Sequence, residues 1–466
     1  MRKIVFAPLL ALGLAACATA GADYRPPETS AASAPSAQGA FHAAQGGMAS
    51  NAPPPGHWWR LYDDPTLDAL IEQALAANAD LRAADANLTR AQAVLREAQA
   101  GRTIGTTAEG GASLTRPSGT GESLPGVVGY DLGLSASYTL DLNGRVRRAI
   151  EASGADVEAS AAARDYVRMS VAAAVARAYV QVCAANYSLR VNQRVVALQR
   201  DTADATRRLF RGGRGTAFDV SRAESAVESS AAGLPAFDAQ RQNGLYLLAT
   251  LLGRSPADYP AEVEGCAALP VLGQPLPAGD GAALIRRRPD IRQAERAIAG
   301  DTARLGVAMA DLYPHVSIGG SLGLSGPLKD FGGGTAFGMS VGPLLSWSFP
   351  NRPVVRARID QADAQVRADL ARFDGTVLEA LRQAETALET YRRDAERAAA
   401  LDAARDSAAV SAGQAQRLFR FGRGDFLSLL DAQRSLASAE AAAAAARSQL
   451  ALDQVAIFLA LGGGWE

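Results

Sequence analysis

The chain contains two copies of one unit, and this internal repeat limits the folds open to it more than any other feature. The stretch LFRGGRG at residues 209–215 returns as LFRFGRG at residues 418–424, 209 positions later. An earlier pair of stretches, at residues 70–81 and 284–291, shares a Leu-Ile pair and a later Asp followed by Leu or Ile, at an offset of 210. The repeat therefore predicts two structural units with one order of elements.

Each copy predicts a helical stretch, two strands, a very long helix, a glycine-rich turn and a returning helix. The first helical stretches are expected at residues 67–100 and 282–311, and the long helices at residues 143–211 and 353–421. The first long stretch contains no proline, and the second contains none after Pro353 at its start. Only the glycine turns therefore end these helices. At about 1.5 Å per residue each long helix extends roughly 100 Å, which no compact globule accommodates.

Four stretches alternate apolar and small polar residues, and they predict strands near residues 103–116, 128–142, 314–326 and 335–349. A half-buried sheet in a soluble protein gives the same alternation. The length of each run favours a second interpretation, because a tilted strand needs about 9–11 residues to cross a membrane. The small polar residues of the other face suit a water-filled lumen. The sequence thus predicts a mainly α protein with a β-barrel part.

Four strands cannot close a membrane barrel, and an open edge in lipid would leave backbone groups unsatisfied. Several copies of the chain must therefore share one barrel. The smallest closed outer-membrane barrels have about eight strands, so two or three copies satisfy closure. The sequence alone does not choose between them.

The N-terminus predicts export and lipid attachment. Residues 1–16 have the charged start, short apolar run and small residues of a signal peptide, and Leu14-Ala15-Ala16-Cys17 resembles a bacterial lipobox. This resemblance implies cleavage before Cys17 and acylation of its thiol, with sorting to the outer membrane of a Gram-negative bacterium. Residues 17–57, rich in Pro, Ala, Ser and Gly, are expected to form an extended tether. The first repeat then covers residues 58–280 and the second residues 281–466.

Composition excludes several other functions. Forty-seven basic residues against 48 acidic ones leave a net charge of −1 and no basic block, so nucleic acid is not an expected partner. Three histidines in the whole chain do not supply a metal cluster or a catalytic base, and we expect neither an enzyme nor a cofactor. In an exported chain the two remaining thiols, Cys183 and Cys266, are expected to form a disulfide.

Several motifs occur together in one order: the lipobox, DYRPP at residues 23–27, WWRLYDDPTLDALI at residues 58–71, RRRPDIRQAE at residues 286–295, and the paired glycine turns. In this combination the mature chain resembles the TolC-type outer-membrane efflux channels and their NodT-like lipoprotein branch. The resemblance implies a homotrimer with a twelve-stranded barrel, a periplasmic helical tunnel and an equatorial collar. It also implies a periplasmic adaptor protein and an inner-membrane pump as partners.

The repeated turns are the first candidate site, because compact glycine turns let a partner approach closely. Capping of the helices accounts for these glycines without any partner. The resemblance implies in addition that the hairpins of the adaptor dock at both tips. The tip residues are Leu209, Phe210, Gly213, Gly215, Leu418, Phe419, Gly422 and Gly424.

A gate is the second candidate site. Leu427 and Asp431 lie four residues apart and share one helical face, and the resemblance places the resting constriction at these positions. Asp219 and Arg423 are candidates for a latch between neighbouring hairpins. Asp431 as an ordinary solvated helix residue is the simpler alternative. Whether the pore rests open or closed is left undecided.

Two other functions fit the same features. A non-conducting lipoprotein that spans the envelope has the long helices but no open lumen. A channel for protein or oligosaccharide export has the same pore and a different cargo. The sequence does not identify the transported substrate.

Overall fold

The computed structural model describes residues 19–44, 49–115, 126–266, 268–334, 336–347, 349 and 352–465. The chain divides into two compact units. The first unit combines the chain up to Glu28 with Ala86–Ala161 and Gln293–Phe373, and the second combines Thr29–Asp85, Ala162–Arg292 and Asp374 onward. Each unit thus takes segments from both sequence repeats.

The helices follow the order of elements that the repeat predicts. In chain order they are η1 (Ala31–Ser33), α2 (Pro35–Gln38), η2 (His42–Ala44), η3 (Trp58–Tyr62), α3 (Pro65–Ala77), α4 (Ala79–Ala100), α5 (Arg145–Arg211), α6 (Ala217–Ala231), α7 (Leu234–Leu251), α8 (Ala261–Glu264), α9 (Gly281–Arg287), α10 (Pro289–Ala310), η4 (Leu328–Asp330), α11 (Arg352–Arg420) and α12 (Phe426–Ala460).

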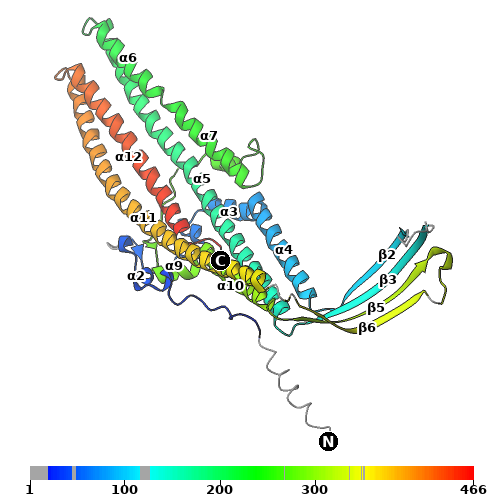
Figure 1. Ribbon diagram of the computed structural model, residues 1–466. Helices are drawn as coiled ribbons and strands as arrows, with labels where there is room; N and C mark the ends of the chain where they lie inside the picture. The colour runs from blue at the N-terminus through cyan, green and yellow to red at the C-terminus, as the bar shows by residue number, and fades with distance from the viewer. Residues whose placement is uncertain are drawn as a thin grey trace. The chain divides into compact units, whose positions relative to one another are not determined.

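The first unit contains a four-stranded sheet, and the four predicted strands are confirmed. They are β2 (Gly105–Thr115), β3 (Val127–Leu140), β5 (His315–Pro327) and β6 (Phe337–Ser346), which lie side by side in the order β2-β3-β5-β6 (Figure 1). Every neighbouring pair is antiparallel. The outer edges of β2 and β6 have no strand partner within the described chain.

The register of the sheet keeps the two kinds of side chain on separate faces. Leu322 of β5 pairs with Leu134 of β3 on one side and with Met339 of β6 on the other. One residue along, Ser321 pairs with Ser340, and their Oγ atoms are 2.7 Å apart. Because successive residues of a strand point to opposite faces, one face is apolar and the other is small and polar. The three leucine and methionine side chains are exposed.

The predicted helical stretches at residues 67–100 and 282–311 each consist of two helices, α3 with α4 and α9 with α10. The breaks fall at Asn78 and at Arg288, which precedes Pro289 and therefore leaves the helical conformation. These equivalent residues also have equivalent contacts. The Asn78 side chain donates to the Leu251 carbonyl at 3.0 Å, and Arg288 donates to the Ala460 carbonyl at 2.8 Å. Each therefore holds the end of the returning helix of its own repeat.

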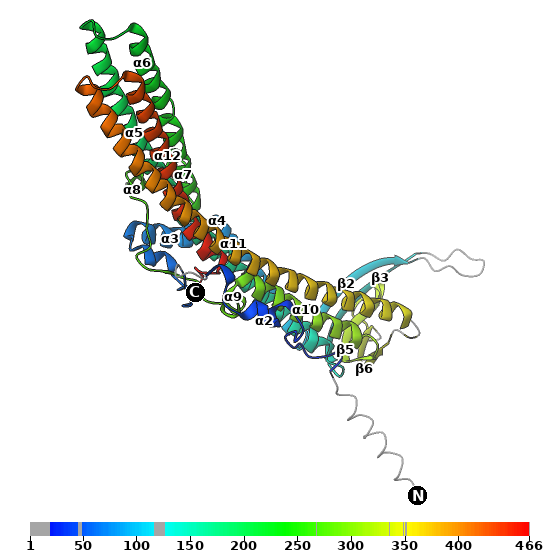
Figure 2. The ribbon, with the colours of Figure 1, turned by 90° about the vertical axis from the view of Figure 1, so that its left-hand side faces the viewer.

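The two long helices are confirmed, with 67 residues in α5 and 69 in α11. In the second unit α6 and α7 return along α5, and α12 returns along α11 (Figures 1 and 2). The first return is split because α6 ends at Ala231 and Pro235 starts the next helix. The second return has no proline and runs unbroken for 35 residues.

The predicted tether is not extended throughout. Residues 31–44 form the short helices η1, α2 and η2 and bind to α11 of the second unit. The amide of Ala31 donates to the Asp374 carboxylate at 2.8 Å, and the amides of His42 and Ala43 donate to Glu385 at 2.8 and 2.9 Å. This segment has too few apolar residues to fold alone. Carboxylates of α11 order it, because they accept hydrogen bonds from its backbone amides.

Beta strand β1 (Ala49–Ser50) pairs with β4 (Leu276–Pro277), and an apolar cluster follows it in the second unit. Trp58 and Trp59 are buried, and the Trp58 ring stacks on Phe458 of α12 with 4.6 Å between ring centroids. Much of the remaining core consists of alanine and valine on α5. Small side chains of this kind let helices approach closely.

Candidate functional site

Both helical hairpins end in the same hydrogen-bonded turn. In the first turn the amide of Arg214 donates to the Leu209 carbonyl at 2.9 Å, and the amide of Gly213 donates to the Phe210 carbonyl at 3.0 Å. In the second turn Arg423 donates to Leu418 at 2.8 Å and Gly422 to Phe419 at 3.0 Å. This pair of bonds is the Schellman motif, which satisfies the last carbonyls of a helix. The two tips therefore have the same hydrogen-bonded backbone geometry.

The four tip glycines meet different demands. Gly213 and Gly422 both have φ of 70°, where an L side chain is strained, although a Cβ would meet nothing within 4 Å. At Gly424 a Cβ would lie 2.9 Å from the Leu418 Cβ, so the close approach excludes a side chain. At Gly215 the nearest atom is the Phe210 nitrogen at 3.4 Å, an ordinary contact. Three of the four glycines are thus required by the turn itself.

The returning helices begin with equivalent caps whose residues are exchanged. At the start of α6 the Thr216 Oγ1 accepts the Asp219 amide at 3.1 Å, and the Asp219 Oδ2 accepts the Thr216 amide at 3.1 Å and its hydroxyl at 2.7 Å. At the start of α12 Asp425 accepts the Ser428 amide at 2.8 Å and hydroxyl at 2.7 Å. These hydrogen bonds hold the pKa of Asp425 below its usual range. In α6 the hydroxyl residue comes first and the carboxylate three residues later, whereas in α12 the carboxylate comes first and the hydroxyl three residues later.

The predicted gate residues share an open face of α12. Leu427 is 53% exposed and Asp431 is exposed, whereas Leu429 and Leu430 between them are buried. A single chain therefore leaves the leucine and the carboxylate uncovered together. Within the described part of the chain Asp431 has no hydrogen-bond or ion-pair partner.

The sequence did not single out the equivalent positions of the first hairpin. Phe218 and Arg222 correspond in the repeat to Leu427 and Asp431. Phe218 is 65% exposed, and the Arg222 guanidinium lies 5.4 Å from the centre of its ring. The offset of 209 contains the signal that identifies them. The two hairpins thus present an apolar residue at the same step but carry opposite charges one turn later.

The predicted latch residues do not contact each other within one chain. Asp219 is used in its helix cap, and Arg423 is exposed, with its amide in the turn. Both cap bonds of Asp219 go to Oδ2. Within the residues that the structure describes, its Oδ1 has no hydrogen-bond partner and is open to a neighbouring chain.

A groove of about 690 Å³ lies between the two tips. Its walls include Leu209 and Phe419, which are both among the predicted tip residues, together with Leu429 of α12. Phe210 and Leu418 do not line it, and both are exposed. Arg208, Arg214 and Arg420 add positive charge at its edge. The structure therefore brings part of the predicted set together around one apolar and basic groove.

The second unit contains the disulfide. The sulfur atoms of Cys183 on α5 and Cys266 in the loop after α8 are 1.97 Å apart and close a separation of 83 residues. The neighbouring Asn186 side chain donates to the carbonyls of Glu264 and Cys266 at 3.0 and 2.9 Å. The bridge and the amide together attach the loop to the long helix. Cys17, the predicted lipid site, lies outside the described residues.

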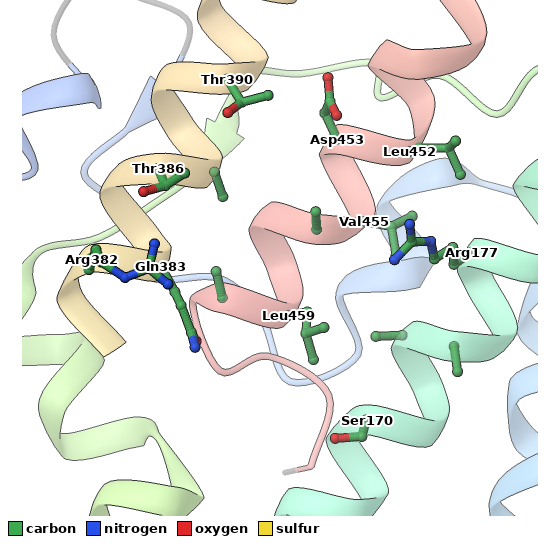
Figure 3. A pocket seen from close by; sticks show the side chains of 15 residues that line it. Ser170, Arg177, Arg382, Gln383, Thr386, Thr390, Leu452, Asp453, Val455 and Leu459 are labelled. Atoms are coloured by element: carbon green, nitrogen blue, oxygen red, sulfur yellow. The ribbon is translucent and has the colours of Figure 1, made fainter. Parts of the chain in front are cut away.

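Sequence reasoning missed a cavity of about 480 Å³ between α5, α11 and α12 (Figure 3). Asp453 lies in its wall and is 6% exposed, and its Oδ1 accepts the Gln449 side-chain amide at 2.7 Å. Burial, together with the nearby Asp394 carboxylate, raises the pKa of Asp453 to about 6. No spacing in the sequence indicates that this residue is buried. Among the residues that the structure describes, no three His, Cys, Asp or Glu side chains gather as metal ligands.

Comparison with known proteins gives a consistent family. The profile of the family described as "Outer membrane efflux protein" matches residues 70–254 and 282–463, one segment for each repeat. Nodulation protein T of Rhizobium leguminosarum bv. trifolii is 29% identical over 462 residues, 98% of this chain and 97% of the relative. The toluene efflux pump outer membrane protein TtgC of Pseudomonas putida is 31% identical over 423 residues, 88% of this chain and 85% of the relative.

Solved structures agree with this match. The outer-membrane channel OprN has a TM-score of 0.87 and 36% identity, with 96% of this chain and 99% of OprN covered. The Neisseria gonorrhoeae MtrE outer membrane channel, solved in its open state, has a TM-score of 0.79 and 27% identity, with 97% and 99% covered. The chain therefore belongs to the outer membrane efflux protein family.

Proposed function

We propose that three copies of the chain form one channel through the outer membrane and release small molecules delivered by an inner-membrane pump and a periplasmic adaptor protein. The open sheet of the first unit is the observation that carries this proposal. In the hydrocarbon region an unpaired strand edge costs several kcal/mol for each unsatisfied backbone group. The free edges of β2 and β6 must therefore pair with other copies, and three copies give a closed barrel of twelve strands.

The faces of the sheet support a pore. The exposed leucine and methionine side chains of one face suit lipid, and the serine and glycine residues of the other suit a water-filled lumen. A structural lipoprotein that conducts nothing needs no polar face on its sheet. This contrast favours the channel over the envelope-spanning structural lipoprotein.

Relatives support small organic molecules as the cargo. TtgC is named as part of a toluene efflux pump, and OpmQ of Pseudomonas aeruginosa, 31% identical over 88% of this chain, is named for pyoverdine export. Both cargoes are small compared with a protein or an oligosaccharide chain. Small-molecule efflux is therefore preferred over macromolecule export for this chain.

The hairpin tips are the proposed docking site for the adaptor. Leu209, Phe210, Leu418 and Phe419 offer apolar contacts, and the compact glycine turns allow close approach. Arginines in the last turn of a helix also stabilise it through the helix dipole, and this effect needs no partner. Within the described chain, however, none of the exposed tip arginines has a carboxylate partner. These are Arg208, Arg211, Arg214, Arg417, Arg420 and Arg423. Acidic side chains on the adaptor would complement them.

Leu427 and Asp431 are the proposed gate. Symmetry would form one ring of leucines and one ring of carboxylates from these positions, an apolar constriction next to a cation-attracting one. Arg423 and the free Oδ1 of Asp219 on a neighbouring hairpin are the proposed latch. An exposed ion pair of this kind contributes about 0–1 kcal/mol, so it biases the closed state without locking it.

The channel is proposed to be a lipoprotein acylated at Cys17. Replacing Cys17 with Ser should abolish labelling by radioactive palmitate while export to the periplasm continues, because the apolar part of the signal peptide is unchanged. Acylation that survives this change would place the lipid elsewhere.

Planar-bilayer recording tests the channel and its gate together. Purified wild-type protein should give discrete conductance steps, and the Leu427→Ala/Asp431→Ala variant should give larger steps with the same oligomer mass. The matched control is Ser435→Ala, an exposed change further along α12 that removes only a hydroxyl group. Absence of steps from both proteins would contradict the channel. Conductance steps of equal size in the wild type and the double variant would show that these two residues do not form the gate.

A further inference from the structure

The N-terminal segment at residues 19–24 lies in a slot of the first unit, at the junction between β3 and α5. The amide of Ala20 donates to the Asn143 carbonyl at 2.9 Å, within the short link between the strand and the helix. The Asn143 side chain in turn donates to the Pro314 carbonyl at 3.3 Å, directly before β5. The segment is thus attached where two strands of the sheet meet the helices.

Arg148 is the centre of this slot. Its side chain is 4% exposed, and its guanidinium donates to the carbonyls of Ala20 and Gly21, both at 3.0 Å. It also donates to the Glu151 carboxylate at 2.7 Å and forms an ion pair with Asp23 at 2.9 Å. Buried arginines with this many partners are costly to disrupt, because removal leaves the partner groups unpaired.

Glycines shape the slot to the segment. Gly21 has φ of 79°, and a Cβ on it would lie 2.8 Å from the Gly306 Cα of α10. A Cβ on Gly306 would lie 3.0 Å from both the Ala20 carbonyl and the Arg148 side chain. The two segments thus touch through a glycine on each side, and neither position has room for a side chain. The close approach of the N-terminal segment to α10 therefore requires glycine at both positions.

The DYRPP motif, which the proposed channel and gate do not explain, has a role in this slot. Asp23 pairs with Arg148, and the Tyr24 hydroxyl donates to Glu295 of α10 at 3.1 Å. The Arg296 guanidinium lies 5.7 Å from the centre of the Tyr24 ring. The first two residues of the motif thus contact both α5 and α10.

We infer that this slot is the docking site of the lipid-bearing N-terminus, and that Arg148 is the residue that positions the anchor at the end of the sheet. The inference rests on the proposed acylation of Cys17. Thr19 is only two residues downstream of Cys17, a reach of at most about 7 Å. Docking thus confines the acyl chains to the membrane edge of the strands.

A purely structural role of Arg148 is the alternative, and a double-mutant cycle separates the two. Four full-length proteins are compared: wild type, Arg148→Met, Cys17→Ser and the double variant. Pulse labelling measures how fast each becomes a membrane-inserted, heat-modifiable oligomer. Hydrogen exchange of the Ala20 amide in the purified proteins measures docking itself.

Arg148→Met should speed exchange at Ala20 at least tenfold in both backgrounds. It should slow insertion several-fold in the acylated protein, and have no further effect in the Cys17→Ser protein. An equal slowing in both backgrounds would show a structural role alone and overturn the inference, as would unchanged insertion of acylated Arg148→Met. If Cys17→Ser keeps its acyl label, the proposed lipid site fails instead, and the label distinguishes this failure from the others.

Two further variants complete the test. Asp23→Ala changes a side chain that is 77% exposed, so it removes one contact of the slot without unfolding the unit. Asp23→Ala should change Ala20 exchange and insertion in the same direction as Arg148→Met, but by less. It therefore replaces Arg148→Met in the test if the Arg148→Met protein does not accumulate. Arg145→Met is the matched control, because Arg145 lies one turn away, is exposed and pairs with Asp311 instead. Its insertion rate and its Ala20 exchange should equal those of wild type, and a loss equal to that of Arg148→Met would contradict the role of the slot.

Discussion

Substitution of the tip glycines should separate positions that look equivalent in the sequence. Gly422 requires a left-handed backbone, which costs an L residue about 1–2 kcal/mol. Part of this cost is offset, because alanine restricts the unfolded chain by about 0.4–1 kcal/mol relative to glycine. Gly422→Ala should therefore weaken the tip by about 1 kcal/mol, and Gly422→Asn by less, because Asn tolerates this conformation better. Gly215→Ala should be neutral or slightly stabilising, because its Cβ would meet only an ordinary contact.

Hydrogen exchange at the Arg423 amide is the appropriate assay, because this amide closes the second turn through its bond to Leu418 at 2.8 Å. A local loss of about 1 kcal/mol corresponds to roughly fivefold faster exchange when the amide opens locally. Gly424→Ala should exceed this increase, because a Cβ there would lie 2.9 Å from the Leu418 Cβ and the backbone must shift.

Gly215→Ala serves as the matched control in the first turn, read at the Arg214 amide, which makes the equivalent bond to Leu209 at 2.9 Å. Equal exchange rates in Gly422→Ala and wild type would refute the reasoning from backbone conformation. A large increase at Arg214 in Gly215→Ala would refute the reasoning from contacts.

Three other changes act away from the tips. The raised pKa of Asp453 means that its charged form is unfavourable in the folded protein, so wild-type stability should fall as pH rises from 4 through 6; Asp453→Asn should raise the thermal midpoint at pH 8 and leave it unchanged at pH 4. Replacing Cys183 and Cys266 with Ala should lower the free energy of unfolding by roughly 4 kcal/mol, measured as a lower denaturant midpoint than that of the oxidised protein, and an equal midpoint would contradict it. Arg288→Met should cost about 1–3 kcal/mol and expose the end of α12 to protease, because it leaves the buried Ala460 carbonyl without its side-chain donor and removes the ion pair with Asp290; wild-type resistance would show that Arg288 is replaceable.

The elements of this fold were predictable because their signals are local. A proline-free stretch of nearly seventy residues indicates a long helix, and strict alternation indicates a strand. The breaks at Asn78 and Arg288 also had local signals, because Pro289 follows one of them and Asn is a common helix cap. The sequence analysis predicted the helical stretches and did not place these breaks within them.

Long-range packing was not predictable in the same way. Apart from Glu151, the partners of Arg148 come from a segment more than 120 residues earlier, and the Asp453 environment combines α11 and α12. No spacing in one sequence reports such contacts. The tether was predicted to be extended from its composition, but amide acceptors on α11 order part of it. Composition measures what a segment can bury by itself and not what another segment offers it.

The second tip carries two carboxylates, Asp425 and Asp431, and the helix caps show which of them needs a functional explanation. Asp219 and Asp425 lie at different steps of their helices, which suggests at first that the two hairpins carry different charges for a purpose. Both acids, however, satisfy the free amides of a helix start, so local structure accounts for them. Asp431 lies beyond the cap, on the exposed face with Leu427, and has no partner within the described chain. The equivalent residue in the first repeat is Arg222. The two repeats thus both have a helix cap but carry opposite charges at this position. The change from Arg222 to Asp431 therefore reverses the charge at the position where the gate is proposed, and no helix cap accounts for it.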